Sequence, residues 1–138
     1  MSATYHIELL TPEKTVLSEE ITALVAPGSE GFLGVLAHHA PLITSLGPGP
    51  LTITLPSGRK DVYSVTGGFL EVSKNHAVIL ADAVERPEEI DVDRARAAME
   101  RARTRLHDRS RELDVDRAEA ALHRALNRLR VAGRPAGL

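Results

Sequence analysis

The segment Asp91-Val92-Asp93-Arg94-Ala95 returns as Asp114-Val115-Asp116-Arg117-Ala118, and an alanine- and arginine-rich stretch follows each copy. Each copy begins with an aspartate, a common helix N-cap, and the apolar residues that follow recur at helical spacing. The repeat therefore predicts two similar helices, over about residues 92–106 and 115–131. A short connection in residues 107–112 would make them an antiparallel helical hairpin.

Four arginines in these two helices have a spacing that can bring them together. Arg94 and Arg101 are seven residues apart, and Arg124 and Arg128 are four apart, so each pair lies on one face of its helix. In an antiparallel hairpin that turns near residue 111, the two faces meet. The spacing therefore predicts that four guanidinium groups converge on one side of the hairpin.

Three interpretations of these arginines are open from the residues alone. The first is a solvated helix face with ion pairs between residues three or four apart. Acidic partners for such pairs are Asp93, Glu100, Glu112 and Glu119. The second is nucleic-acid binding, which is weakened by the absence of aromatic residues from this part of the chain. The third is a small polyanion, because phosphates would replace guanidinium repulsion by charge-assisted bidentate bonds.

The first 84 residues have the pattern of short strands separated by turns. Alternating or β-branched runs are broken by turn residues such as Pro-Gly, Ser-Gly and Lys-Asn, which is typical of a sandwich or flattened barrel. The expected strands cover residues 5–10, 15–17, 20–26, 51–55, 61–66, 69–72 and 76–81. No segment of helical period lies among them, so a parallel sheet with crossover helices is not expected.

Residues 28–41 form a glycine-rich stretch that fits no regular element. One interpretation is a pair of turns in which glycine supplies positive φ angles. The other is an exposed binding loop on a rigid sheet, in which Phe32 would be an apolar contact.

Composition divides the chain into two parts. Residues 1–84 carry four basic and eight acidic side chains, whereas residues 85–138 carry thirteen basic and eleven acidic ones. We therefore expect a strand domain over residues 1–84, a linker over 85–90 and a hairpin over 91–138. The chain has no cysteine, no signal-peptide pattern and no apolar run long enough to span a membrane.

Catalytic and metal-binding patterns are absent from the sequence. There is no cysteine nucleophile, no Gly-x-Ser-x-Gly and no P-loop. His38 and His39 are adjacent, so on an extended strand they would point to opposite faces, which does not suit a metal site. We therefore expect neither catalytic residues nor a resident metal.

The whole chain resembles the epsilon subunit of bacterial F-type ATP synthase. The resemblance rests on Thr4-Tyr5-His6, Gly28-Ser29-Glu30-Gly31, His39-Ala40-Pro41-Leu42-Ile43-Thr44, Gly67-Gly68-Phe69-Leu70-Glu71-Val72, Val78-Ile79-Leu80-Ala81-Asp82 and Asn127-Arg128-Leu129-Arg130-Val131-Ala132. It implies a ten-stranded β-sandwich followed by a C-terminal antiparallel two-helix hairpin, which agrees with the reading of the residues.

The resemblance also implies a non-catalytic rotor subunit of the central stalk. The sandwich would contact the gamma subunit and the membrane-embedded c-ring, through a contact loop with Gly31, Phe32, Gly34 and His39. The hairpin would either fold down or extend toward the catalytic alpha and beta subunits and inhibit ATP hydrolysis. The subunit would lie at the cytoplasmic face of the cell membrane, held there through its partners only.

Some members of this family bind ATP in the folded hairpin through a motif that Ile90-Asp91-Val92-Asp93-Arg94-Ala95 matches. The resemblance implies ATP as a regulatory ligand and not as a catalytic cofactor. Its implied ligands are Glu85, Ile90, Asp91, Arg94, Arg101, Arg124 and Arg128. Two other functions are open: a rotor subunit without nucleotide sensing, and a free-standing module that binds anions or nucleic acid.

Overall fold

Ten strands form a single hydrogen-bonded sheet in the N-terminal part of the computed structural model, which describes residues 3–108 and 115–133. The chain divides into two compact units, Met1–Glu85 and Arg86–Leu138. The strands are β1 (Tyr5–Leu10), β2 (Thr15–Ile21), β3 (Ala23–Gly28), β4 (Gly31–Leu36), β5 (Leu42–Leu46), β6 (Gly49–Thr54), β7 (Lys60–Val65), β8 (Gly68–Ser73), β9 (His76–Ala81) and β10 (Val84–Glu85).

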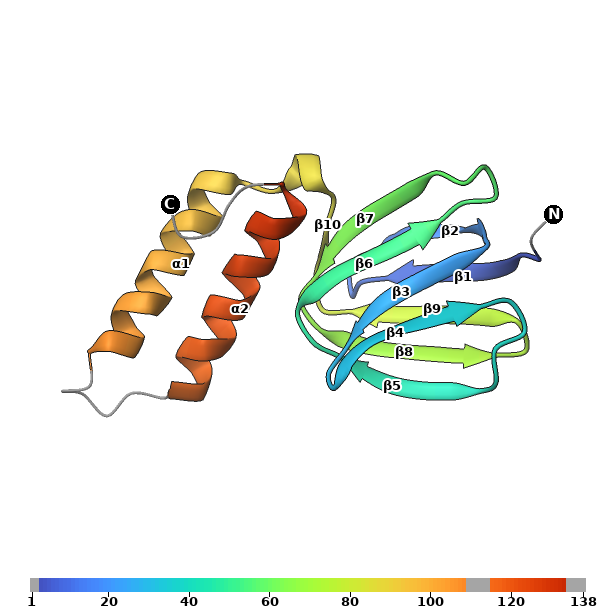
Figure 1. Cartoon of the computed structure of the whole chain (residues 1–138), viewed down its shortest axis with the longest axis horizontal. Coiled ribbons are helices and arrows are strands. Elements are labelled where there is room, and N and C mark those ends of the chain that lie inside the picture. The colour runs from blue at the N-terminus through green and yellow to red at the C-terminus, as the bar shows by residue number, and fades with distance from the viewer. Residues whose placement is uncertain (1–2, 109–114, 134–138) are drawn as a thin grey trace. The chain divides into compact units, whose positions relative to one another are not determined.

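The sheet closes over itself to give the two layers of a sandwich (Figure 1). The strand order is β10-β7-β6-β3-β5-β8-β9-β1-β2, with β4 paired to β3. All neighbouring pairs are antiparallel except β1 and β9, which run parallel with His6 opposite His76. The ten-stranded sandwich expected from the resemblance is thus confirmed. The parallel pair places the first strand, β1, beside the ninth, β9.

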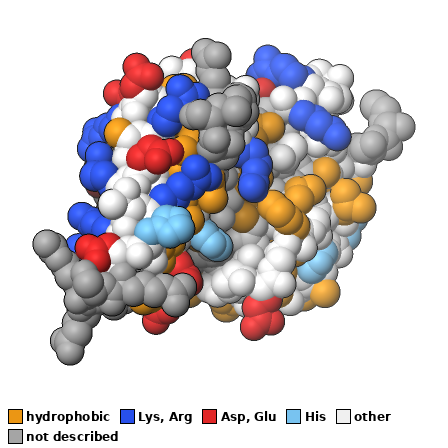
Figure 2. All heavy atoms as spheres, turned by 60° about the vertical axis from the view of Figure 1, so that its left-hand side comes forward, with side chains coloured by type: hydrophobic (Ala, Val, Ile, Leu, Met, Phe, Trp, Pro, Cys, Tyr) orange, Lys and Arg blue, Asp and Glu red, His pale blue; other side chains and the backbone are white. Residues whose placement is uncertain are grey.

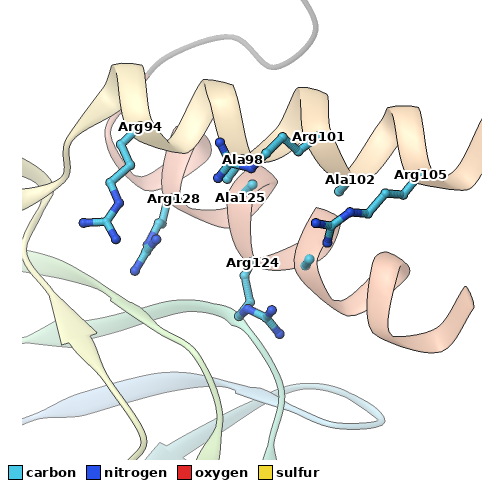
Figure 3. Close-up of a pocket in the computed structure, with 9 residues that line it drawn as sticks. Arg94, Ala98, Arg101, Ala102, Arg105, Arg124, Ala125 and Arg128 are labelled. Atoms are coloured by element: carbon cyan, nitrogen blue, oxygen red, sulfur yellow. The ribbon is translucent and has the colours of Figure 1, made fainter. Parts of the chain in front are cut away.

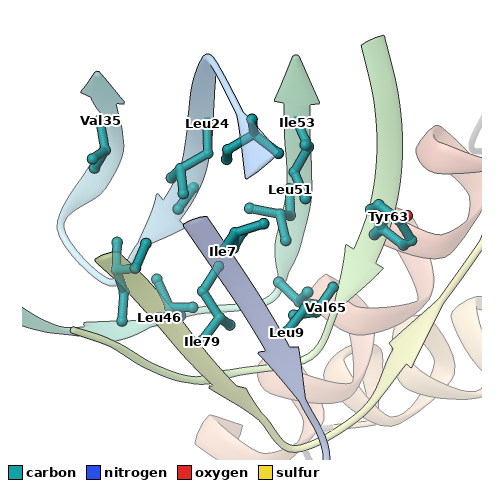
Figure 4. Close-up of a cluster of buried hydrophobic side chains, with 14 of the residues drawn as sticks. Ile7, Leu9, Leu24, Val35, Leu46, Leu51, Ile53, Tyr63, Val65 and Ile79 are labelled. Atoms are coloured by element: carbon teal, nitrogen blue, oxygen red, sulfur yellow. The ribbon is translucent and has the colours of Figure 1, made fainter. Parts of the chain in front are cut away.

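The core of the sandwich follows from the alternation along each strand. In β1, Tyr5, Ile7 and Leu9 are buried and the residues between them are partly exposed, as the two-residue period of a strand requires. Buried aliphatic side chains from β3, β6 and β9 meet them inside the sandwich (Figure 4). Burial of this apolar surface is the main force that stabilises the unit.

Two predictions for the strands were wrong. The glycine-rich stretch is not a pair of turns, nor a loop, over its full length, because Gly31–Leu36 is strand β4 and pairs antiparallel with β3. Its alternation is hidden in the sequence, because the outward face carries the exposed apolar residues Phe32 and Leu36 beside Gly34, so apolar residues occupy both faces. The single strand expected over residues 20–26 is also wrong, because Thr22 separates β2 from β3.

The buried hydroxyl of Tyr5 forms a hydrogen bond that connects two distant strands. It donates to the carbonyl oxygen of Val35 at 2.6 Å, joining β1 to β4. Burial raises the pKa of this phenol well above its ordinary value, because the charged phenolate would lose its hydration. The neutral form is therefore favoured in the folded sandwich.

Tyr5→Phe is expected to remove about 1 kcal/mol of stability near neutral pH, since it deletes the hydrogen bond to Val35. It should also reduce the alkaline loss of stability. The phenol of Tyr5 ionises at about pH 10 in the unfolded chain, whereas its pKa in the folded chain is higher. The stability that the neutral phenol contributes is therefore fully present below about pH 10 and is lost as the pH rises toward the pKa of the folded state. Calorimetry near pH 8 and about pH 11 checks this, and an equal alkaline loss in both proteins would contradict it.

The C-terminal unit is a hairpin of two helices. After the short helix η1 (Pro87–Glu89), α1 covers Val92–His107 and α2 covers Val115–Val131. The two helices pack on each other through Ala95, Met99, Ala125 and Leu129. The predicted pair of helices is confirmed within one or two residues. Of the turn expected at residues 107–112, His107 is the last residue of α1 and Asp108 is its C-cap. Residues 109–112 and the cap expected at Asp114 lie outside the described residues.

Helix ends follow local chemistry. Asp91 is the N-cap of α1, and its Oδ1 accepts a hydrogen bond from the Arg94 backbone N–H at 3.0 Å. This cap satisfies one of the free N–H groups of the first turn and contributes about 1 kcal/mol. Gly133 follows α2 and has a φ of 76°, a left-handed backbone conformation in which glycine commonly ends a helix.

Among the described residues, no helix is both long and apolar enough to cross a lipid bilayer.

Candidate anion-binding site in the hairpin

A groove lined by arginines runs between α1 and α2 (Figure 3). Its volume is about 250 Å³, a little below the roughly 300–1,000 Å³ of most small-molecule sites. It is lined by Arg94, Ala98, Arg101, Ala102, Arg105, Ala121, Arg124, Ala125 and Arg128. The lining therefore consists of five arginines and four alanines, with no carboxylate among them.

The helical period explains this lining. On α1, positions 94, 98, 101, 102 and 105 share one face, and on α2 positions 121, 124, 125 and 128 do. Because the alanine side chains are short, the long arginine side chains extend beyond them and form the walls of the groove. The four arginines predicted to converge all line this groove, so the convergence expected from their spacing is observed. They are Arg94, Arg101, Arg124 and Arg128.

Four of the groove arginines do not form the ion pairs expected of a solvated helix face. Arg94, Arg101, Arg105 and Arg124 make no ion pair or side-chain hydrogen bond with any residue in 3–108 or 115–133. Glu100, one of the expected partners, lies 3.7 Å from Arg103, which does not line the groove. Four guanidinium groups that gather on one groove without a counter-charge among the described residues favour an anionic ligand.

Arg105 is the lining residue that the sequence analysis missed. It lies four residues after Arg101 and eleven after Arg94, so it belongs to the same face of α1. Its signal was present in the spacing. It was not expected because the two predicted pairs, Arg94 with Arg128 and Arg101 with Arg124, do not include it.

The remaining candidate ligands lie outside the groove lining. Ile90 is 7% exposed and precedes α1, and Asp91 is the helix cap described above. Glu85 belongs to β10 in the other unit, where it pairs with Ser64 of β7. The structure therefore brings the four arginines together, and it does not add Glu85, Ile90 or Asp91 to the walls of the groove.

Three residues of the expected contact loop are exposed on the sandwich, and the fourth, His39, is half-buried. Gly31, Phe32 and Gly34 lie on β4 and His39 follows that strand. Phe32 is 63% exposed, a large fraction for an aromatic side chain. Because Phe32 lies on a paired strand, its backbone is fixed, and the residue presents an apolar contact from a rigid support.

A second polar cluster lies on the outer face of β9, β1 and β2. A ring nitrogen of His6 is 3.2 Å from a carboxylate oxygen of Glu20, and one of His76 is 3.6 Å from Glu8. The two imidazole centroids are 5.2 Å apart. In the described part of the chain, no group of three side chains has the arrangement of a metal site. These contacts connect neighbouring strands.

Basic side chains are prominent on the surface where the hairpin side of Figure 1 comes forward (Figure 2). Lys and Arg side chains lie there with acidic side chains between some of them. The face is therefore mixed in charge, and the arginine groove is the place where one sign is concentrated.

Comparison with known proteins supplies the family. The family model of the ATP synthase Delta/Epsilon chain beta-sandwich domain matches residues 4–87, and that of the long alpha-helix domain matches residues 88–133. The ATP synthase epsilon chain of Carboxydothermus hydrogenoformans is 52% identical over 104 residues, 75% of this chain and 77% of that protein. That of Moorella thermoacetica is 50% identical over 107 residues, 78% of this chain and 80% of that protein.

Solved structures agree with this result. A chain of the Euglena gracilis mitochondrial ATP synthase, solved as OSCP/F1/c-ring, matches with a TM-score of 0.82 and 29% identity over 91% of this chain and 79% of that one. A chain of the Tetrahymena thermophila mitochondrial ATP synthase central stalk/c-ring matches in fold, with a TM-score of 0.67 and 20% identity. The match covers 95% of this chain and 98% of that one. This chain therefore belongs to the ATP synthase delta/epsilon family, as an epsilon subunit of the central stalk of an F-type ATP synthase.

Proposed function

We propose that this chain is a non-catalytic, regulatory subunit whose helical hairpin binds ATP in its folded form and inhibits ATP hydrolysis when it opens. The observation that carries the proposal is the groove with five arginines and no lining carboxylate. A triphosphate chain carries enough negative charge to turn guanidinium repulsion into charge-assisted hydrogen bonds.

Within this proposal the residues divide by chemistry. Arg94, Arg101, Arg124 and Arg128 hold the phosphates or the base, since a guanidinium both donates in a fork and stacks on flat rings. Asp91 accepts hydrogen bonds from polar groups of the nucleoside. The alanines of the groove leave room for the ligand between the arginine walls.

The sandwich is the anchoring part of the proposed subunit. It contacts the gamma subunit and the c-ring, and exposed apolar side chains such as Phe32 support a protein contact on this unit. The chain thus reaches the cytoplasmic face of the membrane through its partners. The opened hairpin contacts the alpha and beta subunits.

The hairpin suits a two-state element because its own core is small. Its fully packed residues are Ala95, Met99, Ala125 and Leu129, two of which are alanine. At about 25 cal/mol per Å² of buried apolar surface, alanines contribute little. A ligand that binds only the folded form adds RT ln(1 + [L]/Kd) to the stability of the folded hairpin, about 1.4 kcal/mol for each tenfold excess of ligand over Kd. The ligand can therefore decide how much of the hairpin is folded and how much is open.

Calorimetric titration of the full chain with ATP tests the proposal. We expect saturable binding that Arg94→Ala and Arg128→Ala each weaken roughly tenfold or more, because a hydrogen bond to a charged group contributes about 1.5–3 kcal/mol. Arg130→Ala, on the same helix as Arg128 but outside the groove lining, is the matched control and should bind like the parent. Equal heats in all four proteins would refute the proposed site.

Two other functions make different predictions. A rotor subunit without nucleotide sensing would bind no ATP at millimolar concentration and would still bind gamma. A free-standing anion- or nucleic-acid-binding module would bind oligonucleotides in a salt-dependent way and would not associate with gamma. Membership of the ATP synthase family favours the first of these two over the second.

A further inference from the structure

We propose that Arg105 distinguishes a nucleoside triphosphate from a diphosphate in the arginine groove, an inference that rests on the proposed binding of ATP there. Arg105 lines the groove together with the four arginines implicated above. It lies outside the sequence motif that pointed to ATP, and its placement in the structure is what assigns it this role.

The position of Arg105 makes it an end residue of the groove. It is one helical turn beyond Arg101, about 6 Å along the axis of α1, and about 16 Å from Arg94. On α2, Ala121 is the lining residue that lies before Arg124, and no arginine before Arg124 lines the groove. Arg105 is therefore an arginine of the groove that lies beyond the two pairs Arg94 with Arg128 and Arg101 with Arg124.

The charges at the other end of the groove orient the ligand. Glu89 of η1 is paired with Arg86, since its carboxylate accepts a hydrogen bond from the Arg86 backbone N–H and lies 3.8 Å from the Arg86 Nε. The other carboxylates at this end belong to Glu88 of η1, to Asp91, the cap of α1, and to Asp93 in the first turn of α1. These carboxylates repel phosphate and accept hydrogen bonds from the hydroxyl and amino groups of a nucleoside. A nucleotide with its nucleoside at this end extends its phosphates along α1 toward Arg101 and then Arg105.

The terminal phosphate is then the one that reaches Arg105. Within the described residues the Arg105 side chain makes no ion pair, so its fork of donors is available to a phosphate. Arg103, its neighbour on a different face of α1, lies 3.7 Å from Glu100 and does not line the groove. A ligand shortened by one phosphate loses the contact with Arg105 and keeps the contacts with the other arginines.

The test compares ATP and ADP binding to the full chain and to Arg105→Ala by calorimetric titration, with Arg103→Ala as the matched control. Alanine favours the helix at both positions, so helical circular dichroism should be unchanged. We expect Arg105→Ala to weaken ATP about tenfold or more and ADP less than about threefold, so that the preference for ATP falls; Arg103→Ala should keep it.

The outcomes separate the two proposals. If the parent chain binds neither nucleotide, the proposed function fails and this inference fails with it. If the parent prefers ATP and Arg105→Ala keeps the same ratio of ATP to ADP affinity, the role of Arg105 is wrong and the ATP site stands. An equal loss in Arg103→Ala would assign the effect to general charge, and would also overturn the role of Arg105.

Discussion

Gly68→Ala is expected to destabilise the sandwich by about 3–5 kcal/mol, the sum of backbone strain and overpacking. Gly68 has a φ of 133°, a conformation that residues with a Cβ rarely adopt. A Cβ at this position would also collide with the backbone carbonyl oxygen of Leu80 and lie 2.8 Å from the Cα of Ala81. These atoms belong to the neighbouring strand β9, so they cannot move without breaking the pairing of β8 with β9.

Two glycine controls separate strain from collision. Gly34→Ala, where the nearest atom to a new Cβ is 3.9 Å away and no positive φ is required, should be nearly neutral. Gly58→Ala combines a φ of 90° with open space and should cost about 1–2 kcal/mol. Because both tyrosines, Tyr5 and Tyr63, lie in the sandwich, urea unfolding followed by tyrosine fluorescence measures this unit. A Gly68 variant as stable as the Gly34 variant would contradict the prediction.

Leu129→Ala is expected to unfold the hairpin while the sandwich stays folded. Leu129 is completely buried among the few residues of the hairpin core, and Leu→Ala at such a site costs about 2–5 kcal/mol. Two isolated helices of this length are only marginally stable in water without their packing. Helical circular dichroism should therefore fall strongly at room temperature, and tyrosine fluorescence should remain that of the parent protein.

Val115→Ala is the matched control for this experiment. Val115 lies on the same helix but is 51% exposed, and alanine favours helix over valine, so helical content should stay equal or rise slightly. If Leu129→Ala lost both signals together in urea, the hairpin would not unfold as a separate element. Recovery of the helical signal by ATP in the Leu129 variant would add support for binding to the folded form.

The arginine groove was predictable in part because helical spacing is a local property. Arg94 and Arg101 share a face of α1, and Arg124 and Arg128 share a face of α2, whatever the rest of the chain does. Antiparallel pairing was inferred from the repeat and the short connection. Arg105 belongs to neither of the two predicted pairs, and only the packed hairpin showed that the groove continues past them.

The sandwich was predictable as a class and not in its pairing. Alternation along residues 5–10 and 76–81 identified strands β1 and β9, but nothing local indicated that they pair in parallel. Strand β4 was missed because its outward positions carry Phe32, Gly34 and Leu36 and no polar side chain, so the two-residue period does not show. Its identity comes from hydrogen bonds to β3, which are contacts between separate segments.

Sequence alone determined the two helices, the cap at Asp91 and the faces that carry the arginines, because these depend on residues within a few positions of one another. The tertiary structure decided the strand order, the strand character of residues 31–36 and the burial of Asn127 on α2. It also placed Arg105 in the groove wall. These features depend on which distant segments pack together, and the free energy of that packing is not encoded in any single stretch of the chain.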